Sequence, residues 1–128
     1  MYGPHLMLDC YGSPKEILSD IGFLYDVLEE LPEVIGMHKI MPPYVFRYDG
    51  GDIPEDWGLS GIVLIAESHI AIHTYPEKEY LTVDVFSCKE FNLDETKAYI
   101  IEKFMVKKYE IHHLERGHDF PRSVAVVR

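Results

Sequence analysis

The chain has 128 residues with 22 acidic and 12 basic side chains, which give a formal net charge of −10. This charge repels phosphate backbones and anionic lipid surfaces, so we expect no nucleic-acid or membrane partner. The length fits a single domain over residues 1–128, and no apolar run approaches the roughly 20 residues that cross a bilayer. Because no basic segment followed by an apolar one opens the chain, we expect a cytoplasmic protein.

The first part of the chain predicts a strand followed by a helix. Residues 5–10 alternate well enough to form a strand. A Ser-Pro-Lys-Glu sequence then predicts a helix with Ser13 as its N-cap, and Pro32 and Gly36 predict its end. Between these limits apolar side chains recur every three or four positions, at Ile17, Ile21, Leu24, Leu28 and Leu31.

The middle of the chain predicts two strands of different kinds. Residues 37–48 have a strand pattern that two adjacent prolines interrupt, which is typical of the edge of a sheet. After a glycine-containing loop at residues 49–54, residues 59–66 are apolar on both faces. That pattern predicts an interior strand covered on both sides, and it is a first indication of a subunit contact.

The second half predicts a hairpin, a helix and a last strand. Residues 70–75 and 80–88 alternate as strands on either side of a short turn. A second helix starts near Asn92, with an acidic capping partner three residues later, and a last strand covers residues 109–114. The order β-α-β-β-β-β-α-β predicts an α+β fold, a two-layer sandwich of an antiparallel sheet with two helices packed on one face. Residues 117–128 are expected to form an extended tail.

Strand alternation sorts the side chains of the predicted hairpin by face. Leu81, Val83 and Val85 form an apolar face that suits the helices. His73 and Cys88 therefore fall on the opposite face, which is mixed and polar. Such a face suits a functional site or a subunit contact.

The histidines and cysteines do not show the pattern of a metal site. His69 and His73 are four residues apart, which separates them by about 13 Å in a strand. Neither the seven histidines nor Cys10 and Cys88 show the ligand spacing of a zinc site. We therefore predict no metal centre, and we expect Cys10 to be a small buried core residue.

The sequence Glu67-Ser68-His69 interrupts the strand pattern, so these three residues are expected to turn. The residues alone leave two interpretations open. The ordinary one is a serine that hydrogen-bonds the backbone of a turn. The other is a hydroxyl held close enough to attack the preceding carbonyl carbon, with Ser60 as a candidate group for stabilising the oxyanion.

Five separated stretches of the chain share the pattern of one known family. They are Gly3-Pro4-His5, Ser60-Gly61, Ala66-Glu67-Ser68-His69, Ile72-His73-Thr74-Tyr75-Pro76-Glu77 and Asp84-Val85-Phe86-Ser87-Cys88. The spacings from Ser68 to His73 and to Cys88 also agree with the family pattern. By these residues the chain resembles the small prokaryotic, pyruvoyl-dependent S-adenosylmethionine decarboxylases, whose fold is a two-layer sandwich.

The resemblance implies a proenzyme that cuts itself between Glu67 and Ser68. Ser68 would attack the Glu67 carbonyl and turn the amide into an ester, with Ser60 assisting. His73 would then remove the α-proton of residue 68, and β-elimination would free a β chain, residues 1–67. The dehydroalanine left behind would hydrolyse to a pyruvoyl group at the start of the α chain, residues 68–128.

The resemblance also implies the roles of the mature enzyme. The pyruvoyl ketone would form a Schiff base with the substrate amine and delocalise the carbanion that decarboxylation leaves. Cys88 would reprotonate the product carbon, and Glu77 would be a substrate-site carboxylate. The sulfonium cation of the substrate suits aromatic side chains; the candidates are Phe46, Tyr48, Trp57 and Phe86. A homodimer of processed protomers is also implied.

The chain departs from the family pattern at residues 41–46 and 56–58, which are longer and more aromatic here, and Tyr75 stands where many relatives have tryptophan. The first two departures lead toward the substrate pocket and bear on substrate identity. The leading hypothesis is an S-adenosylmethionine decarboxylase that supplies aminopropyl groups for spermidine and polyamine synthesis. The alternatives are a pyruvoyl-dependent ornithine or arginine decarboxylase, or a non-catalytic relative that serves as a binding or regulatory subunit.

Overall fold

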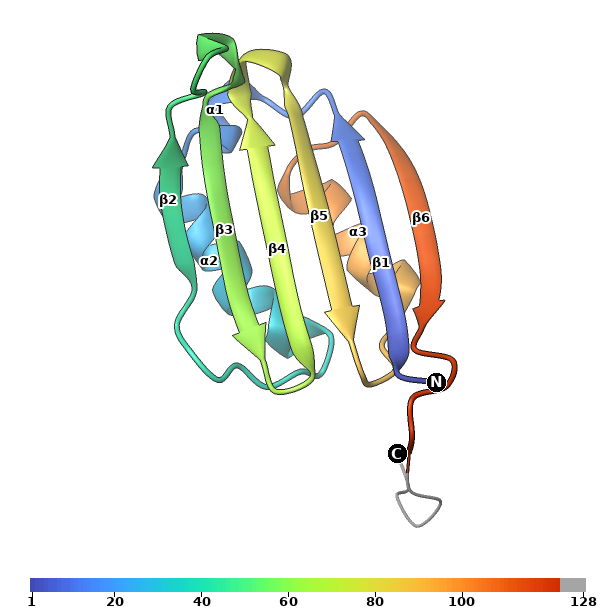
Figure 1. The fold of residues 1–128 in the computed structure, drawn as a ribbon. Coiled ribbons are helices and arrows are strands. Elements are labelled where there is room, and N and C mark those ends of the chain that lie inside the picture. Colours follow the sequence, from blue (N-terminus) through green and yellow to red (C-terminus); the bar gives the residue numbers. More distant parts are fainter. Residues whose placement is uncertain (123–128) are drawn as a thin grey trace.

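The computed structural model describes residues 1–122, and residues 123–128 of the expected tail lie outside the described range. The strands are β1 Gly3–Tyr11, β2 Tyr44–Tyr48, β3 Gly58–Ile65, β4 Ser68–Tyr75, β5 Tyr80–Ser87 and β6 Lys108–Arg116. The helices are α1 Lys15–Leu18, α2 Ile21–Val34 and α3 Leu93–Lys103, with 3-10 turns η1 Pro54–Asp56 and η2 Pro76–Lys78. The strands form one antiparallel sheet in the order β2-β3-β4-β5-β1-β6 (Figure 1).

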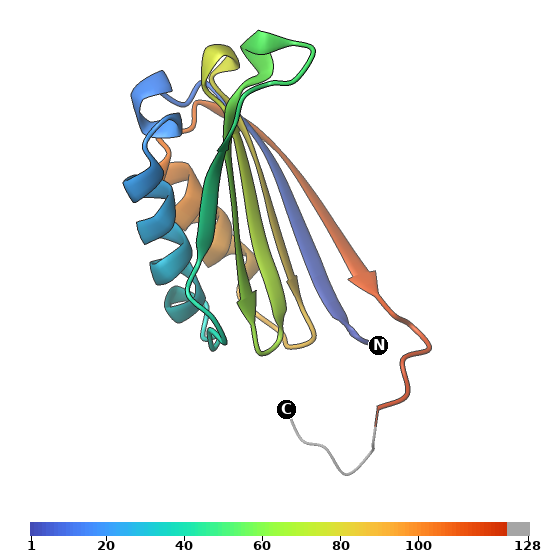
Figure 2. The same ribbon diagram turned by 60° about the vertical axis from the view of Figure 1, so that its left-hand side comes forward.

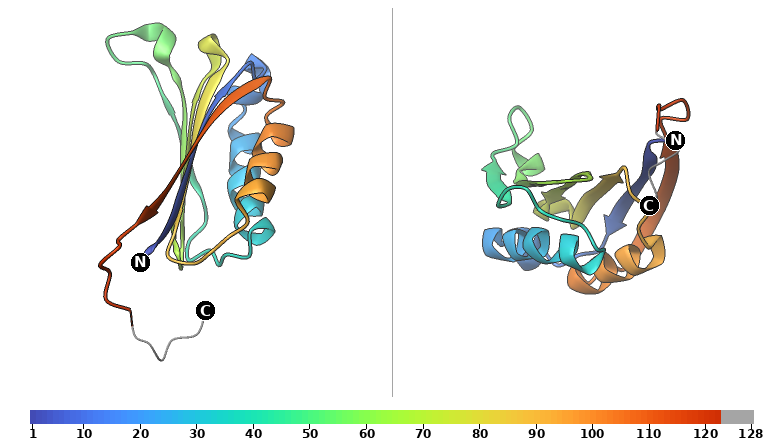
Figure 3. Two further views of the ribbon diagram at one scale, coloured as in Figure 1. Left: turned by 90° about the vertical axis from the view of Figure 1, so that its right-hand side faces the viewer. Right: turned by 90° about the horizontal axis from the view of Figure 1, so that it is seen from below.

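The three helices lie on one face of the sheet and leave the other face open within the described residues (Figure 2). The view from below shows the same two layers, with the helices beneath the sheet (Figure 3). The α+β sandwich is confirmed, with three helices among the described residues in place of the two that were predicted. No helix among the described residues combines the length and the apolar character that crossing a membrane requires.

The core lies between the helices and the covered face of the sheet. Its fully buried side chains are mostly leucine, isoleucine and valine from β1, β3, β4 and β5, together with the inner sides of α2 and α3. Each such side chain contributes about 1.5–3 kcal/mol by leaving water. Cys10 belongs to this core, as predicted, and burial raises the pKa of its thiol to about 12. Thr74 is also buried, and its hydroxyl donates to the Leu18 carbonyl at 2.7 Å.

The first predicted helix is wrong in detail, because the chain forms two helices there. The Ser13 hydroxyl does not cap a helix; it donates to the Phe104 carbonyl inside the core at 2.7 Å. The short helix α1 ends at once, and Asp20 caps α2 by accepting from the Phe23 N–H at 3.0 Å. Pro32 lies inside α2 instead of ending it, because the loss of one backbone donor near the helix end is tolerated there.

Two further expectations about strands also need correction. The interrupted strand of residues 37–48 is reduced to β2, which is an edge strand as predicted; Lys39 forms only an isolated bridge with Ile65. The strand β3 is not covered on both sides within this chain, since Leu64 on its outer face is 41% exposed. The hairpin of β4 and β5 is confirmed, and so is the Asn92 cap, which accepts from the Glu95 N–H at 2.9 Å.

The turn at the predicted cleavage site is tighter than expected. Only Ala66 and Glu67 turn, because Ile65 already pairs with Ser68 across the β3–β4 hairpin. Ser68 is therefore the first residue of β4 and pairs with Ser87 of β5. The prediction that residues 67–69 turn is therefore wrong. Two residues are enough to connect two antiparallel strands, so the strand resumes at Ser68.

Candidate active site

The structure brings Glu67, Ser68 and Cys88 together at one end of the sheet. The Glu67 carbonyl oxygen accepts a hydrogen bond from the Cys88 backbone N–H at 2.9 Å. The Ser68 hydroxyl is half-buried and lies 3.3 Å from the Tyr2 hydroxyl, at hydrogen-bond distance. The carbonyl that a serine nucleophile would attack is thus already polarised by an amide donor, which is how an oxyanion is stabilised.

The Glu67 side chain is also fixed. Its carboxylate accepts from the His38 backbone N–H at 3.2 Å and lies 3.3 Å from the His38 ring nitrogen Nδ1. Burial raises the pKa of this carboxyl, but the hydrogen bonds from His38 outweigh burial and leave the pKa of Glu67 below its ordinary value. The Ala66 N–H donates to the His38 carbonyl at 2.7 Å. The segment around His38 therefore holds both residues of the turn.

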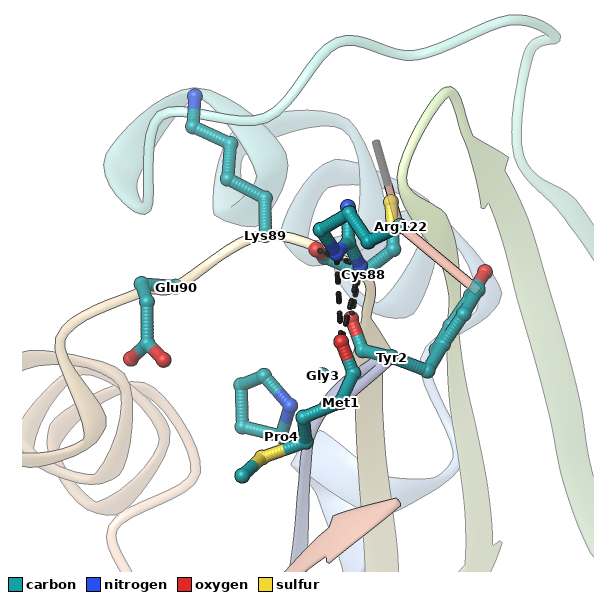
Figure 4. Close-up of a pocket in the computed structure, with 8 residues that line it drawn as sticks. All are labelled: Met1, Tyr2, Gly3, Pro4, Cys88, Lys89, Glu90 and Arg122. Atoms are coloured by element: carbon teal, nitrogen blue, oxygen red, sulfur yellow. Dashed lines mark hydrogen bonds between the residues drawn. The ribbon is translucent and has the colours of Figure 1, made fainter. Parts of the chain in front are cut away.

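Cys88 borders a hollow of about 240 Å³ between the first residues of the chain and the segment that follows β5 (Figure 4). A side chain at Gly3 would come within 1.9 Å of the Ser87 carbonyl oxygen, so only glycine lets the two backbones approach this closely. The Arg122 guanidinium donates to the Tyr2 carbonyl at 2.6 Å and lies 3.5 Å from the Cys88 carbonyl. The first residues of the chain and Arg122 thus converge on Cys88.

Ser60 and His73 form a separate pair. The Ser60 hydroxyl lies 3.0 Å from His73 Nδ1, because the two residues are opposite each other in the β3–β4 register. His73 is exposed on the open face of the sheet. It lies five residues along β4 from Ser68, which corresponds to about 16 Å of extended strand. A single chain therefore does not bring His73 to Ser68.

Glu77 lies at the same end of the sheet as His73, in the turn η2 after β4. Its carboxylate pairs with Lys15 Nζ at 2.7 Å and accepts from the Trp57 indole N–H at 3.1 Å. The Lys15 ammonium, and then the indole N–H, lower the pKa of Glu77 below its ordinary value. The carboxylate is exposed, so it presents a fixed negative charge beside an aromatic ring.

The candidate aromatic side chains divide between the two ends. Phe86 belongs to the Ser68 end, where the Arg116 guanidinium carbon lies 4.0 Å from its ring centre. Tyr48 lines one hollow and Phe46 lines another, and each hollow also includes Ser60 and His73. Trp57 lies beside Glu77, and Arg47 covers its ring at 4.2 Å.

We define two half-sites from these contacts. The Ser68 half-site comprises Tyr2, Glu67, Ser68, Phe86 and Cys88, and the His73 half-site comprises Phe46, Tyr48, Trp57, Ser60, His73 and Glu77. Tyr2, His38 and Arg122 were not predicted as site residues. Tyr2 directly precedes the Gly3-Pro4-His5 stretch, which was a usable signal, whereas nothing in the sequence pattern indicates Arg122 or His38.

The Ser68 half-site fits a pyruvoyl group generated in place. Such a group needs a serine whose preceding carbonyl is held in a stabilising contact. The Cys88 N–H on the Glu67 carbonyl supplies this condition, and Cys88 itself borders an open hollow. The residues present are therefore compatible with self-processing at this bond.

A family model described as S-adenosylmethionine decarboxylase matches residues 4–117. An S-adenosylmethionine decarboxylase proenzyme from Moorella thermoacetica is 35% identical over 98% of this chain and 95% of its own length. An arginine decarboxylase proenzyme from Pyrobaculum arsenaticum is 34% identical over 91% of this chain and 85% of its own. The crystal structure of the adenosylmethionine decarboxylase from Aquifex aeolicus matches with a TM-score of 0.78 and 28% identity, over 95% of this chain and 96% of that one.

Proposed function

Because the chain belongs to the S-adenosylmethionine decarboxylase family, we propose that it is a proenzyme that cleaves itself and then decarboxylates S-adenosylmethionine. The observation that carries the proposal is the contact between the Cys88 N–H and the Glu67 carbonyl directly before Ser68. In the cell the product would donate aminopropyl groups to spermidine synthesis. We place this activity in the cytoplasm.

Self-cleavage begins with attack of the Ser68 hydroxyl oxygen on the Glu67 carbonyl carbon. The Cys88 N–H stabilises the negative charge that develops on the carbonyl oxygen. The bond between the carbonyl carbon and the Ser68 nitrogen then breaks, and the hydroxyl proton ends on that nitrogen, which leaves an ester. Glu67 is held in place by His38 throughout this step, so the attacked carbonyl has little freedom to move away.

The second step is the loss of the α-proton of residue 68 to a base. The bond between Cβ and the ester oxygen breaks, Glu67 leaves as a free carboxylate, and the remaining double bond takes up water and loses ammonia to give a ketone. His73 is the proposed base. In its own chain His73 lies about 16 Å away along the strand, so the base must come from a second copy.

A homodimer completes the site if two copies pack their open sheet faces together about a two-fold axis. The Ser68 half-site of one protomer then lies against the His73 half-site of the other, twice in each dimer. The open face has the apolar surface that such a contact buries, since Leu64, Phe46 and Tyr44 are 41%, 45% and 60% exposed. Burial of these side chains would drive association.

In the mature enzyme each half-site has its own task. The pyruvoyl ketone supplies an electron sink for the carbanion that decarboxylation generates. Cys88 lies next to that group and carries a thiol proton for the product carbon. The partner's Glu77 and nearby aromatic rings offer negative charge and π faces to a sulfonium cation.

The test is the intact mass of the purified protein combined with release of labelled carbon dioxide. We expect two chains, residues 1–67 and residues 68–128 with a ketone in place of the serine amine, and turnover of S-adenosylmethionine. Ser68→Ala should remain one chain and release no carbon dioxide. Turnover of arginine or ornithine in place of S-adenosylmethionine would shift the proposal to the activity named for the Pyrobaculum relative. A wild-type chain that stays intact would support a non-catalytic subunit.

A further inference from the structure

We propose that Tyr2 is a catalytic residue of self-cleavage, and that residues 117–122, the carboxyl-terminal strap, hold it in place. The Tyr2 hydroxyl fixes the rotamer of Ser68 for attack on the preceding carbonyl. This inference rests on the proposed function, because it assigns a role within the self-cleavage step.

Tyr2 makes a side-chain hydrogen bond to the attacking group. Its hydroxyl oxygen lies 3.3 Å from Ser68 Oγ, across 66 residues of sequence. The Tyr2 ring is held from two sides, since its centre lies 5.3 Å from that of Phe86 and 5.0 Å from that of Phe120, the latter edge-on. A phenol ring fixed by two aromatic neighbours loses little further entropy when its hydroxyl binds the serine.

The strap and Arg116 hold the Tyr2 backbone by hydrogen bonds. The Tyr2 N–H donates to the carbonyls of Arg116 and Gly117 at 2.8 and 2.9 Å. Gly117 has a φ of +65°, and a side chain there would come within 2.6 Å of Tyr2 Cβ. The Arg122 guanidinium then donates to the carbonyls of Met1 and Tyr2 at 3.2 and 2.6 Å (Figure 4).

The hydroxyl of Tyr2 can act at only one stage of processing. A serine hydroxyl turns about its Cα–Cβ bond among three staggered positions, and only a position facing the Glu67 carbonyl leads to attack. A fixed partner for Oγ selects one position before the reaction, which lowers the entropic part of the barrier. Once the oxygen has become part of the ester, this partner has no further task. The proposal therefore assigns Tyr2 to ester formation and not to the later elimination.

The primary experiment is the cleavage half-time of Tyr2→Phe, followed by denaturing electrophoresis of freshly made full chain. This variant keeps the ring contacts and removes only the hydroxyl. We expect cleavage about tenfold slower than in the wild type, the factor that one hydrogen bond supports. Tyr11→Phe is the matched control, because it removes a phenol hydroxyl that binds Glu110 away from Ser68, and it should cleave at the wild-type rate.

Hydroxylamine distinguishes a defect in ester formation from general loosening of the site. It attacks an accumulated ester and releases residues 1–67 as a hydroxamate and residues 68–128 with a serine amine. A chain blocked at elimination, such as His73→Ala, should be cut rapidly by hydroxylamine. Tyr2→Phe should not be cut faster, because in this variant the ester forms slowly and does not accumulate.

Arg122→Ala tests the strap without changing Tyr2 and guards against misfolding of the first variant. We expect the same pattern, slower cleavage that hydroxylamine does not accelerate, with partial recovery in Arg122→Lys. Wild-type half-times in Tyr2→Phe, or an ester in that variant that hydroxylamine cuts, would overturn the role of Tyr2 alone. A wild-type chain that never cleaves would overturn the proposed function and this inference together.

Discussion

The two half-sites are built from different kinds of contact. In the Ser68 half-site, backbone groups do most of the holding: the Cys88 N–H binds the Glu67 carbonyl, and the His38 N–H binds the Glu67 carboxylate. In the His73 half-site, side chains bind one another and remain exposed to solvent, as in the Ser60–His73 pair. The first half-site therefore fixes a peptide bond, and the second presents acid, base and aromatic groups.

This difference indicates that neither half-site is complete. Residue 68 cannot lose its α-proton without a base. The described part of the Ser68 half-site contains no histidine within hydrogen-bond distance of Ser68. The Ser60–His73 pair in turn has no carbonyl to act on in its own chain, because the strand separates it from Ser68 by about 16 Å. In the proposed homodimer, packing two open faces together would supply each half-site with what it lacks.

The largest predicted effect is complementation between two inactive chains. Ser68→Ala and His73→Ala should each stay uncleaved alone. When the two are co-expressed with different tags, the His73→Ala chain should be cleaved, because the partner's His73 serves its intact Ser68. Intact mass of each tagged chain measures the result, and the Ser68→Ala chain should remain whole in every mixture. A mixture with no cleavage at all would show that Ser68 and His73 act within one chain.

The next largest effect concerns Cys88, for which we propose one task through its backbone and another through its side chain. Cys88→Ala keeps the N–H that binds the Glu67 carbonyl, so self-cleavage should proceed at close to the wild-type rate. Loss of the thiol should lower the rate of carbon dioxide release by about 10²–10⁴-fold, the usual contribution of a positioned acid. Cys10→Ala is the matched control, since its thiol is buried in the core. Unchanged turnover in Cys88→Ala would remove Cys88 from the acid role.

The overall fold could be predicted from the sequence because it depends on local periodicity. The alternation in β4 and β5 correctly separates the buried Ile70 and Ile72 from the exposed His73. The Asn92 cap was also predictable, since it needs only a backbone N–H three residues away. Ser13 has the same local signature and fails, because a distant carbonyl, that of Phe104, competes for its hydroxyl. Local rules hold where no tertiary partner intervenes.

The candidate site was only partly predictable for a related reason. Motif spacing predicted Ser68, His73 and Cys88 as site residues, but spacing alone does not show which of them lie at the same end of the sheet. The contacts of Tyr2 and Arg122 arise because the first residues of the chain and Arg122 meet beside Cys88. These contacts join residues 34 to 120 positions apart, and no periodic pattern records them.

A smaller effect is expected from Glu77, which sharpens the role of the His73 half-site in substrate binding. Glu77→Gln keeps the shape of the side chain and removes its charge, so it should raise KM for S-adenosylmethionine about tenfold with a smaller change in kcat. Self-cleavage should be unaffected, because neither of its two proposed steps uses the Glu77 carboxylate. Lys15→Ala tests whether the position of the carboxylate matters as well as its charge. This variant removes the ion pair that holds the Glu77 carboxylate and leaves the negative charge of Glu77 unchanged. A fall in kcat with an unchanged KM would instead place Glu77 at the reacting atoms.

The smallest effect is the pH dependence of stability from His5, which lies beside Phe86 in the Ser68 half-site. Burial, with smaller repulsion from Arg116 and His69, lowers the pKa of His5 below 6.5 despite attraction to Asp84. The unfolded chain therefore binds a proton at higher pH than the folded chain does. The free energy of unfolding should fall as pH drops below about 6.5 and level off below the folded-state pKa.

Urea unfolding at several pH values between 7 and 5 measures this slope. His5→Gln cannot titrate, so its free energy of unfolding should depend less on pH than that of the wild type in this window. His118→Gln removes an exposed histidine and is the matched control, with an expected slope equal to that of the wild type. A steeper slope in His5→Gln would mean that protonated His5 is stabilised by Asp84, so that the attraction between them exceeds the cost of burial.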